Sequence, residues 1–229
     1  MTILLFFIQI FINNHLLLLL RWFNILKIAV LGSTKGTDLQ AVIDAIESKK
    51  LNNVEISFVL SNKEGSYILE RARNHDIKAI FLDGKGKTRE EYDKEVDRLL
   101  QEHEVELVLL VGYMKLMSSW FVQRWLNKVM NIHPSLLPKY AGGMDKCVHE
   151  TVLENGDKVT GCTLIFIDEG ADTGPIILQK EVKVDEGETV DPLKEKVQKA
   201  EQEVIIKGIE LFRDKKIKVE GHKVHILKE

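Results

Sequence analysis

Asn131, His133 and Asp172 are the side chains whose types and spacing indicate chemistry. His133 stands in the run NIHPSLLP after an apolar stretch, so we expect a buried strand to end there in a rigid loop. Histidine exchanges a proton near neutral pH, and asparagine donates to a developing oxyanion. An aspartate in the glycine-bounded run DEGADTGP would orient the imidazole and keep it protonated. Together the three side chains predict acyl-group transfer.

The same residues also have a purely structural interpretation. A histidine followed by proline is more often a loop residue hydrogen-bonded to backbone than a catalyst. Asp168 and Glu169 in the same run are rival carboxylates, and spacing alone does not choose Asp172 over them.

The composition is that of an ordinary globular chain. Of 229 residues, 45% are hydrophobic and 29% are charged, so we expect one domain with one sizeable core. The net charge is -3 and basic residues are interleaved with acidic ones, so no basic field would hold a nucleic-acid backbone. Cys147 and Cys162 belong to no paired spacing, which predicts neither a zinc site nor a disulfide and favours a reducing, cytoplasmic location.

Residues 1–26 differ from the rest and form an apolar N-terminal extension before a domain of residues 27–229. Residues 3–20 are about long enough to span a bilayer, but a central polar cluster makes insertion marginal. The extension has neither a basic start nor a small-residue cleavage site, so it does not fit a secretory signal. The extension is therefore either a mis-assigned translation start or a membrane anchor. An anchor would keep the domain on the cytoplasmic side, because Arg21 and Lys27 follow it.

From residue 27 the pattern alternates between strands and helices. Apolar runs predict strands at 27–31, 54–60, 79–82, 107–111 and up to His133, and helical spacing predicts helices at 39–46, 67–75 and 89–102. Such alternation predicts an α/β fold with a doubly wound, mostly parallel sheet related to the Rossmann fold. The loop of residues 32–38 and the Asn131–His133 stretch both fall at carboxyl ends of strands, where such sheets bind ligands.

The last third of the chain predicts a different pairing. Residues 148–153 and 191–213 have helical spacing, and residues 159–167 and 176–184 read as two antiparallel strands. Residues 217–226 predict a small hairpin. We therefore expect a C-terminal antiparallel portion.

The loop of residues 32–38 leads from a strand into a helix and contains Gly36, Thr37 and Asp38. Backbone N–H groups at a helix start stabilise a phosphate. Alternatively, Gly36 makes a turn and Thr37 or Asp38 caps the helix. The loop matches neither a Walker motif nor the three-glycine dinucleotide motif, so this pattern alone is a weak signal.

Residues 131–138, read with residues 168–175, resemble the signature of the folate-dependent formyltransferase family, over about residues 27–212. The resemblance implies transfer of a formyl group from the co-substrate 10-formyltetrahydrofolate to the amine of 5-phosphoribosylglycinamide in purine synthesis. It implies that His133 and Asn131 donate to the oxygen of a tetrahedral species, and that Asp172 holds the imidazole and relays a proton. No metal is required.

The resemblance also implies two sets of binding residues. The folate would meet Arg89, Met114, Lys115, Leu116, Met117 and Asn131, and the phosphorylated ribose would meet Gly36, Thr37, Asp38, Gln198 and Glu201. Without the resemblance, the same residues read as a loop, a solvated charge cluster and an exposed polar helix face.

Three departures from the family pattern fall near the acceptor side. Asp38 stands where many members have Asn, Ile165 where many have His, and the loop of residues 141–148 is longer than usual. These departures leave two other functions open. One is a formyltransferase that acts on another amine, such as an amino sugar nucleotide or methionyl-tRNA. The other is a catalytically silent protein that binds folate or a nucleotide. The tRNA enzyme usually carries a further C-terminal barrel that this chain has no residues to build. The expected partners are small molecules, and the pattern specifies no oligomeric state.

Overall fold

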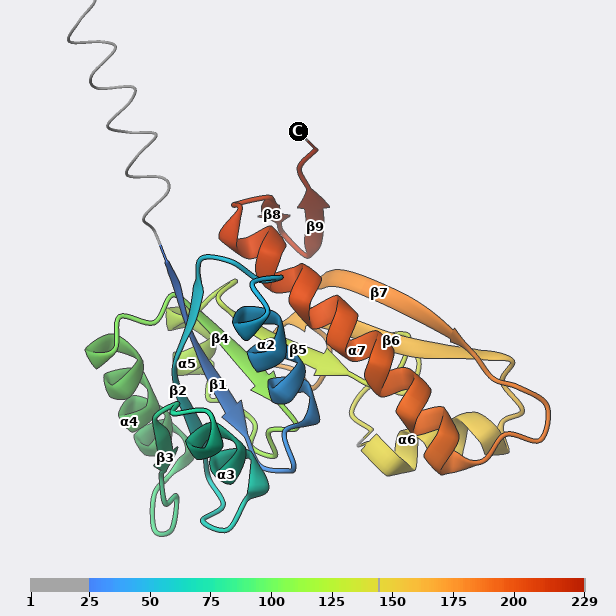
Figure 1. The fold of residues 1–229 in the computed structure, drawn as a ribbon, viewed down its shortest axis with the longest axis horizontal. Coiled ribbons are helices and arrows are strands. Elements are labelled where there is room, and N and C mark those ends of the chain that lie inside the picture. The colour runs from blue at the N-terminus through green and yellow to red at the C-terminus, as the bar shows by residue number, and fades with distance from the viewer. Residues whose placement is uncertain (1–24, 144, 229) are drawn as a thin grey trace, which may run out of the picture.

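A seven-stranded sheet with the order β3-β2-β1-β4-β5-β6-β7 organises the computed structural model, which describes residues 25–143 and 145–228 (Figure 1). The strands are β1 (Leu26–Gly32), β2 (Val54–Ser61), β3 (Ala79–Phe81), β4 (Leu107–Val111), β5 (Val129–His133), β6 (Val159–Phe166), β7 (Ile176–Lys183), β8 (Ile217–Glu220) and β9 (Lys223–Ile226). The helices are α2 (Thr37–Glu47), α3 (Tyr67–Asn74), α4 (Arg89–Glu102), α5 (Ser119–Arg124), α6 (Asp145–Glu154) and α7 (Val190–Arg213).

The strand directions confirm the predicted fold class. Strands β1 to β5 pair in parallel, whereas β6 and β7 are antiparallel to their neighbours. The β8–β9 hairpin forms a separate two-stranded sheet. The largest boundary difference is in α6, which begins at Asp145 and not at Val148.

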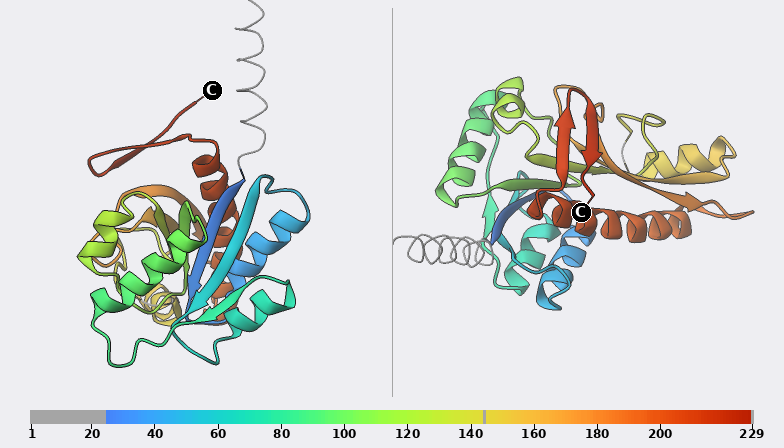
Figure 2. Two further views of the ribbon diagram at one scale, coloured as in Figure 1. Left: turned by 90° about the vertical axis from the view of Figure 1, so that its left-hand side faces the viewer. Right: turned by 90° about the horizontal axis from the view of Figure 1, so that it is seen from above.

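Helices cover both faces of the sheet, which explains the continuous apolar strands (Figure 2). Helices α2, α3, α6 and α7 pack on one face with Ile28 and Val30, while α4 and α5 pack on the other with Ala29 and Leu31. All four of these β1 side chains are fully buried. Because successive residues of a strand face opposite sides, β1 contributes to both halves of the core.

The chain reverses its direction of winding next to β1. After β1 it builds β2 and β3 on one side, and then returns so that β4 pairs with the other side of β1. The loops that follow β1 and β4 therefore diverge, which opens a crevice at the carboxyl ends of these strands. Gly32 allows the close approach of the two strands, because a Cβ there would lie 2.8 Å from the Val111 carbonyl oxygen.

The β8–β9 hairpin lies at the end of the molecule where β1 begins (Figures 1 and 2). Its turn reaches the loop between β6 and β7, where His222 Nε2 lies 2.6 Å from the Thr173 carbonyl oxygen. The hairpin therefore contacts the segment that carries Asp172.

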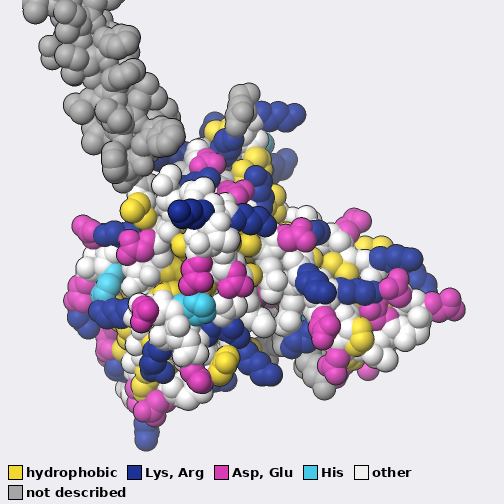
Figure 3. Space-filling model, viewed as in Figure 1, with side chains coloured by type: hydrophobic (Ala, Val, Ile, Leu, Met, Phe, Trp, Pro, Cys, Tyr) yellow, Lys and Arg dark blue, Asp and Glu magenta, His cyan; other side chains and the backbone are white. Residues whose placement is uncertain are grey.

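The predicted anchor at residues 3–20 lies outside the described residues. Among the helices of residues 25–143 and 145–228, none has the length and apolar character of a membrane span. Figure 3 shows basic and acidic side chains mixed over one face, as the interleaved sequence predicts.

The central strands dominate the stability, so we expect Leu109→Ala in β4 to lower the free energy of unfolding by about 2–5 kcal/mol. Leu109 is fully buried, and its truncation leaves a cavity in the core. The matched control is Leu126→Ala, because Leu126 is 60% exposed, and its change should stay within about 0.5 kcal/mol. Urea unfolding measures both, and equal losses would contradict this description of the core.

Candidate functional site

Strand β5 presents Asn131 and His133 on one face and Met130 and Ile132 on the other. Met130 and Ile132 point into the core under α7, whereas Asn131 and His133 point to the opposite face because side chains alternate along a strand. The His133 side chain is 3% exposed. The run NIH thus combines one core position with two functional positions.

The loop after His133 is held by hydrogen bonds to the neighbouring strands. The Thr163 hydroxyl donates to the Ser135 carbonyl (2.6 Å) and accepts from the Leu137 N–H (3.0 Å). The Ser135 hydroxyl donates to the Lys139 carbonyl (2.6 Å), and Gln179 donates to the Leu137 carbonyl (2.9 Å). Strand β5 ends at His133, as predicted, and these hydrogen bonds tie the following loop to β6 and β7.

Asp172 comes from the loop between β6 and β7, which doubles back along β5. The loop starts beside Val129, since Ile167 N–H donates to the Val129 carbonyl. Within it, the Asp168 carboxylate accepts from Gly170 N–H (3.0 Å) and from the Thr173 hydroxyl (2.7 Å). Asp172 adopts a left-handed conformation with φ +57°, which aspartate tolerates better than most residues.

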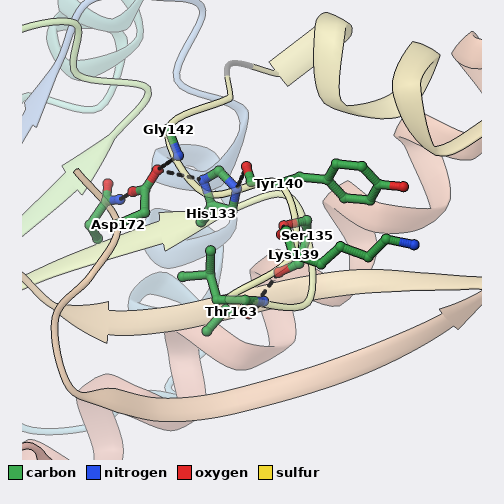
Figure 4. Close-up of polar contacts among 9 residues, drawn as sticks. His133, Ser135, Lys139, Tyr140, Gly142, Thr163 and Asp172 are labelled. Carbon is green, nitrogen blue, oxygen red and sulfur yellow. Dashed lines mark hydrogen bonds and ion pairs between the residues drawn. The ribbon is translucent and has the colours of Figure 1, made fainter.

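The Asp172 carboxylate gathers three donors (Figure 4). Its Oδ2 lies 3.1 Å from His133 Nδ1 and accepts from Gly142 N–H at 3.0 Å, while its Oδ1 accepts from Asn131 Nδ2 at 3.1 Å. The rival carboxylates are engaged elsewhere, Asp168 within its own loop and Glu169 with Gln123. Among these three acids, Asp172 is therefore the one that contacts the imidazole.

The pKa of the Asp172 carboxyl is lowered from its ordinary value. Burial acts in the opposite direction and is the largest single influence, but it is outweighed by the hydrogen bonds and charge of His133 together with the bonds from Gly142 and Asn131. The carboxylate is therefore ionised at neutral pH.

The other edge of the His133 ring faces backbone. Its Nε2 lies 3.0 Å from the Tyr140 carbonyl oxygen. A carbonyl and an ionised carboxylate both only accept hydrogen bonds, so the ring satisfies both partners only when each nitrogen carries a proton. In that form the ring donates a hydrogen bond from each edge.

These side chains line one cavity of about 960 Å³ at the carboxyl ends of β1, β4 and β5. The cavity contains nearly all the residues that the sequence analysis singled out, namely Gly36, Thr37, Asp38, Met114, Lys115, Leu116, Met117, Asn131, His133, Asp172, Gln198 and Glu201. Residues far apart in sequence therefore meet at one surface.

One predicted residue is not brought to this surface. Arg89 is the first residue of α4 and is absent from the described cavity lining. Its charge instead acts on the nearby Asp93 carboxylate, which accepts from Ser118 N–H. Its predicted contact with folate has no support from this arrangement.

The loop after β4 gives the cavity an apolar wall. Met114 and Leu116 are 42% and 59% exposed, whereas Met117 is buried. Met114 N–H donates to the Ser33 hydroxyl (2.9 Å), which ties this loop to the end of β1. The Lys115 ammonium packs over the Tyr92 ring at 4.5 Å from its centroid. Flexible, exposed apolar side chains of this kind suit a flat aromatic ligand.

The opposite wall is polar and acidic. Gln198 Nε2 lies 3.5 Å from Thr37 Oγ1, which brings α7 to the start of α2. Asp38 and Glu201 are 8% and 7% exposed, so Glu201 is not part of an exposed polar face. The N-cap of α2 is Gly36, with φ +68° and no side-chain cap, so the alternative of a Thr37 or Asp38 cap is wrong.

Several lining residues were missed by the sequence analysis. On α7, Asp191, Lys194 and Glu195 line the cavity with Gln198 and Glu201, and Lys35 joins them from the loop after β1. Counting back by three and four residues from Gln198 along the helix would have found the first three. No cluster of three or more potential metal ligands occurs among the described residues.

The sequence matches the family described as formyl transferase over residues 26–209. It is 35% identical to a phosphoribosylglycinamide formyltransferase of Haemophilus influenzae, over 87% of this chain and 93% of that protein. It is also 42% identical to the trifunctional purine biosynthetic protein adenosine-3 of Chironomus tentans, over 81% of this chain. The chain spans 13% to 19% of the length of the trifunctional relatives that it matches.

A solved structure shows the same fold. Glycinamide ribonucleotide transformylase 1 from Symbiobacterium toebii superposes with a TM-score of 0.84 and 36% identity, covering 90% of this chain and 96% of that one.

Cys162 lies fully buried on β6, and its thiol should be inert in the folded chain. Burial, and then the negative charges of Glu201 and Asp38, raise the pKa of the thiol to about 12. At pH 8 the thiolate fraction is then at least about a thousandfold below that of an ordinary cysteine. Mass spectrometry of the Cys162 peptide after iodoacetamide treatment should show alkylation in urea but not in buffer. Equal rates in both would contradict the burial.

Proposed function

Because the chain belongs to the formyl transferase family, we propose that it transfers a formyl group from 10-formyltetrahydrofolate to the primary amine of 5-phosphoribosylglycinamide in purine synthesis. The observation that carries the proposal is the contact of both Asn131 and His133 with Asp172 at one cavity. That cavity has an apolar wall on one side and a polar wall on the other, which suits one flat aromatic and one polar substrate.

His133 and Asn131 supply the stabilisation of charge. When the amine attacks the formyl carbon, the formyl oxygen gains negative charge. His133 Nδ1 and Asn131 Nδ2 already converge on the anionic oxygens of Asp172, so both donors are oriented towards negative charge before reaction. The formyl oxygen, bound beside these donors, is stabilised by them as its charge develops. Preorganised donors of this kind lower the barrier because they need no reorientation.

The proposed role of Asp172 is proton transfer. As the new carbon–nitrogen bond forms and the bond to N10 of the folate breaks, the amine gives up one proton and N10 takes one. Asp172 lines the cavity and contacts His133, so a proton leaving the amine passes to this pair and returns to N10 from it. No net charge is left on the protein.

The polar wall fits the acceptor. Gly36 and Thr37 place the first turn of α2 at the cavity, and Gln198 approaches Thr37 from α7. A phosphate would meet backbone donors there. The Asp38 carboxylate lies in the same first turn, and Ile165 lines the cavity with an apolar side chain, so another amine is the alternative acceptor. The partners proposed are two small molecules, and a cytoplasmic location stays a prediction.

The acceptor is tested by mixing the purified full chain with 10-formyltetrahydrofolate and one amine at a time. We expect tetrahydrofolate release with 5-phosphoribosylglycinamide and none with methionyl-tRNA or an amino sugar nucleotide, because the start of α2 offers backbone donors to one terminal phosphate and the chain has no basic field for a nucleic acid. Release is followed by absorbance. Release only with another amine would change the substrate, and folate binding without release to any amine would refute the transferase.

The catalytic roles are tested by His133→Ala and Asp172→Asn. Each should lower kcat on the order of a hundredfold or more. His133→Ala removes a donor to the oxyanion, and Asp172→Asn removes the charge that holds the His133 ring. His225→Ala is the matched control, since His225 is 51% exposed on the C-terminal hairpin, and it should keep the wild-type rate. Circular dichroism checks folding. A folded His133→Ala chain with full activity would defeat the assignment.

A further inference from the structure

The Tyr140 carbonyl holds the edge of His133 that faces away from the cavity. Its oxygen lies 3.0 Å from His133 Nε2, and Tyr140 is absent from the described cavity lining, whereas Asp172 is present in it. The Nδ1 edge of the ring therefore faces Asp172, which lines the cavity, and the Nε2 edge contacts backbone (Figure 4). A ring turned over about its Cβ–Cγ bond would place C–H groups against both acceptors.

Tyr140 has a backbone conformation that tyrosine rarely adopts. Its φ is +64°, in the left-handed region, where the Cβ of a large side chain is crowded. Such a conformation persists only where surrounding interactions determine it. The loop backbone supplies one such interaction, since the Gly143 N–H donates to the Tyr140 carbonyl oxygen at 3.2 Å.

The side chain of Tyr140 supplies a second set of interactions, which reaches beyond the loop. Its hydroxyl donates to Asp157 Oδ2 at 2.7 Å and accepts from Asn155 Nδ2 at 2.8 Å. Lys139 Nζ lies 2.7 and 2.6 Å from the two Asp157 oxygens, and also 5.0 Å from the centre of the Tyr140 ring. The Asp157 side chain is only 17% exposed, and hydrogen bonds from Lys139 and then Tyr140 lower its pKa. The carboxylate is therefore a fixed, charged acceptor for the phenol.

We propose that Tyr140 and Asp157 are positioning residues for formyl transfer: their hydrogen bond fixes the Tyr140 carbonyl, which holds Nε2–H of His133 and keeps Nδ1–H on the reacting side. The inference rests on the proposed function. It assigns the hydrogen-bond donor on the reacting side to Nδ1 of His133. Neither Tyr140 nor Asp157 lines the cavity, so their effect on the reaction passes through the imidazole.

Tyr140→Phe removes the phenol oxygen and keeps the ring. We expect kcat to fall by about tenfold, and KM for both substrates to stay near wild type, because a loosened imidazole misplaces the donor without touching either substrate. Tyr67→Phe is the matched control, since Tyr67 is 47% exposed on α3 and should keep full activity. A change confined to KM, or an unchanged kcat, would overturn the proposal.

Asp157→Asn and Asp157→Ala separate positioning from folding. The amide oxygen of asparagine still accepts from the phenol, so Asp157→Asn should retain more activity than Asp157→Ala. Tyr140→Phe should cost less in the Asp157→Ala background than in the wild type, because the bond to Asp157 is already gone and only the bond from Asn155 is left to lose. Equal losses in the two Asp157 variants, or additive losses in the double variant, would count against the bond as the cause.

Nitrogen-15 NMR of the His133 ring reads the same bond without turnover. In the wild type, Nε2–H should exchange slowly with water because a carbonyl holds it, and Tyr140→Phe should speed that exchange. A loss of kcat with an unchanged Nε2–H signal would refute the route through the imidazole. Because this signal does not depend on the amine, it also distinguishes failure of the positioning proposal from failure of the proposed function.

Discussion

The Asp172 carboxylate is the group on which the site depends, because it draws an imidazole N–H, a side-chain amide and a backbone amide to one point. The donors come from strand β5 and from the loop after it, whereas the carboxylate comes from the loop between β6 and β7. Burial alone would disfavour its charge, and the donors compensate for that cost. One ionised group thereby joins segments that share no secondary structure.

The sheet topology explains why this convergence occurs at a cavity. Parallel strands β1, β4 and β5 deliver their following loops to one edge, and the reversal of winding beside β1 separates those loops. The loop after β4 then offers apolar side chains, while α7 crosses to meet the start of α2 with polar ones. Two chemically different walls follow from one change in strand order.

The sequence predicted most elements because burial on both faces produces distinct apolar strands, as in β4, and one-sided burial produces the helical stripe of α7. The meeting of His133 and Asp172 came from a resemblance in motif, since spacing left Asp168 and Glu169 as rivals. The Tyr140 carbonyl and the Gly142 N–H were missed, because every residue has these groups and residue type does not reveal them. Arg89 was placed on the right helix, but local pattern does not fix which way a helix end faces.

Because β6 runs antiparallel to β5, the number of residues between the end of β6 and Asp172 is constrained. Strand β6 ends level with the start of β5, so the chain must travel back along β5 before its acid can meet the imidazole. One residue of extended chain covers about 3.3 Å, which exceeds the tolerance of a hydrogen bond. The stretch from Ile167 to Asp172 therefore admits exchange of exposed side chains such as Ala171 far more readily than insertion or deletion.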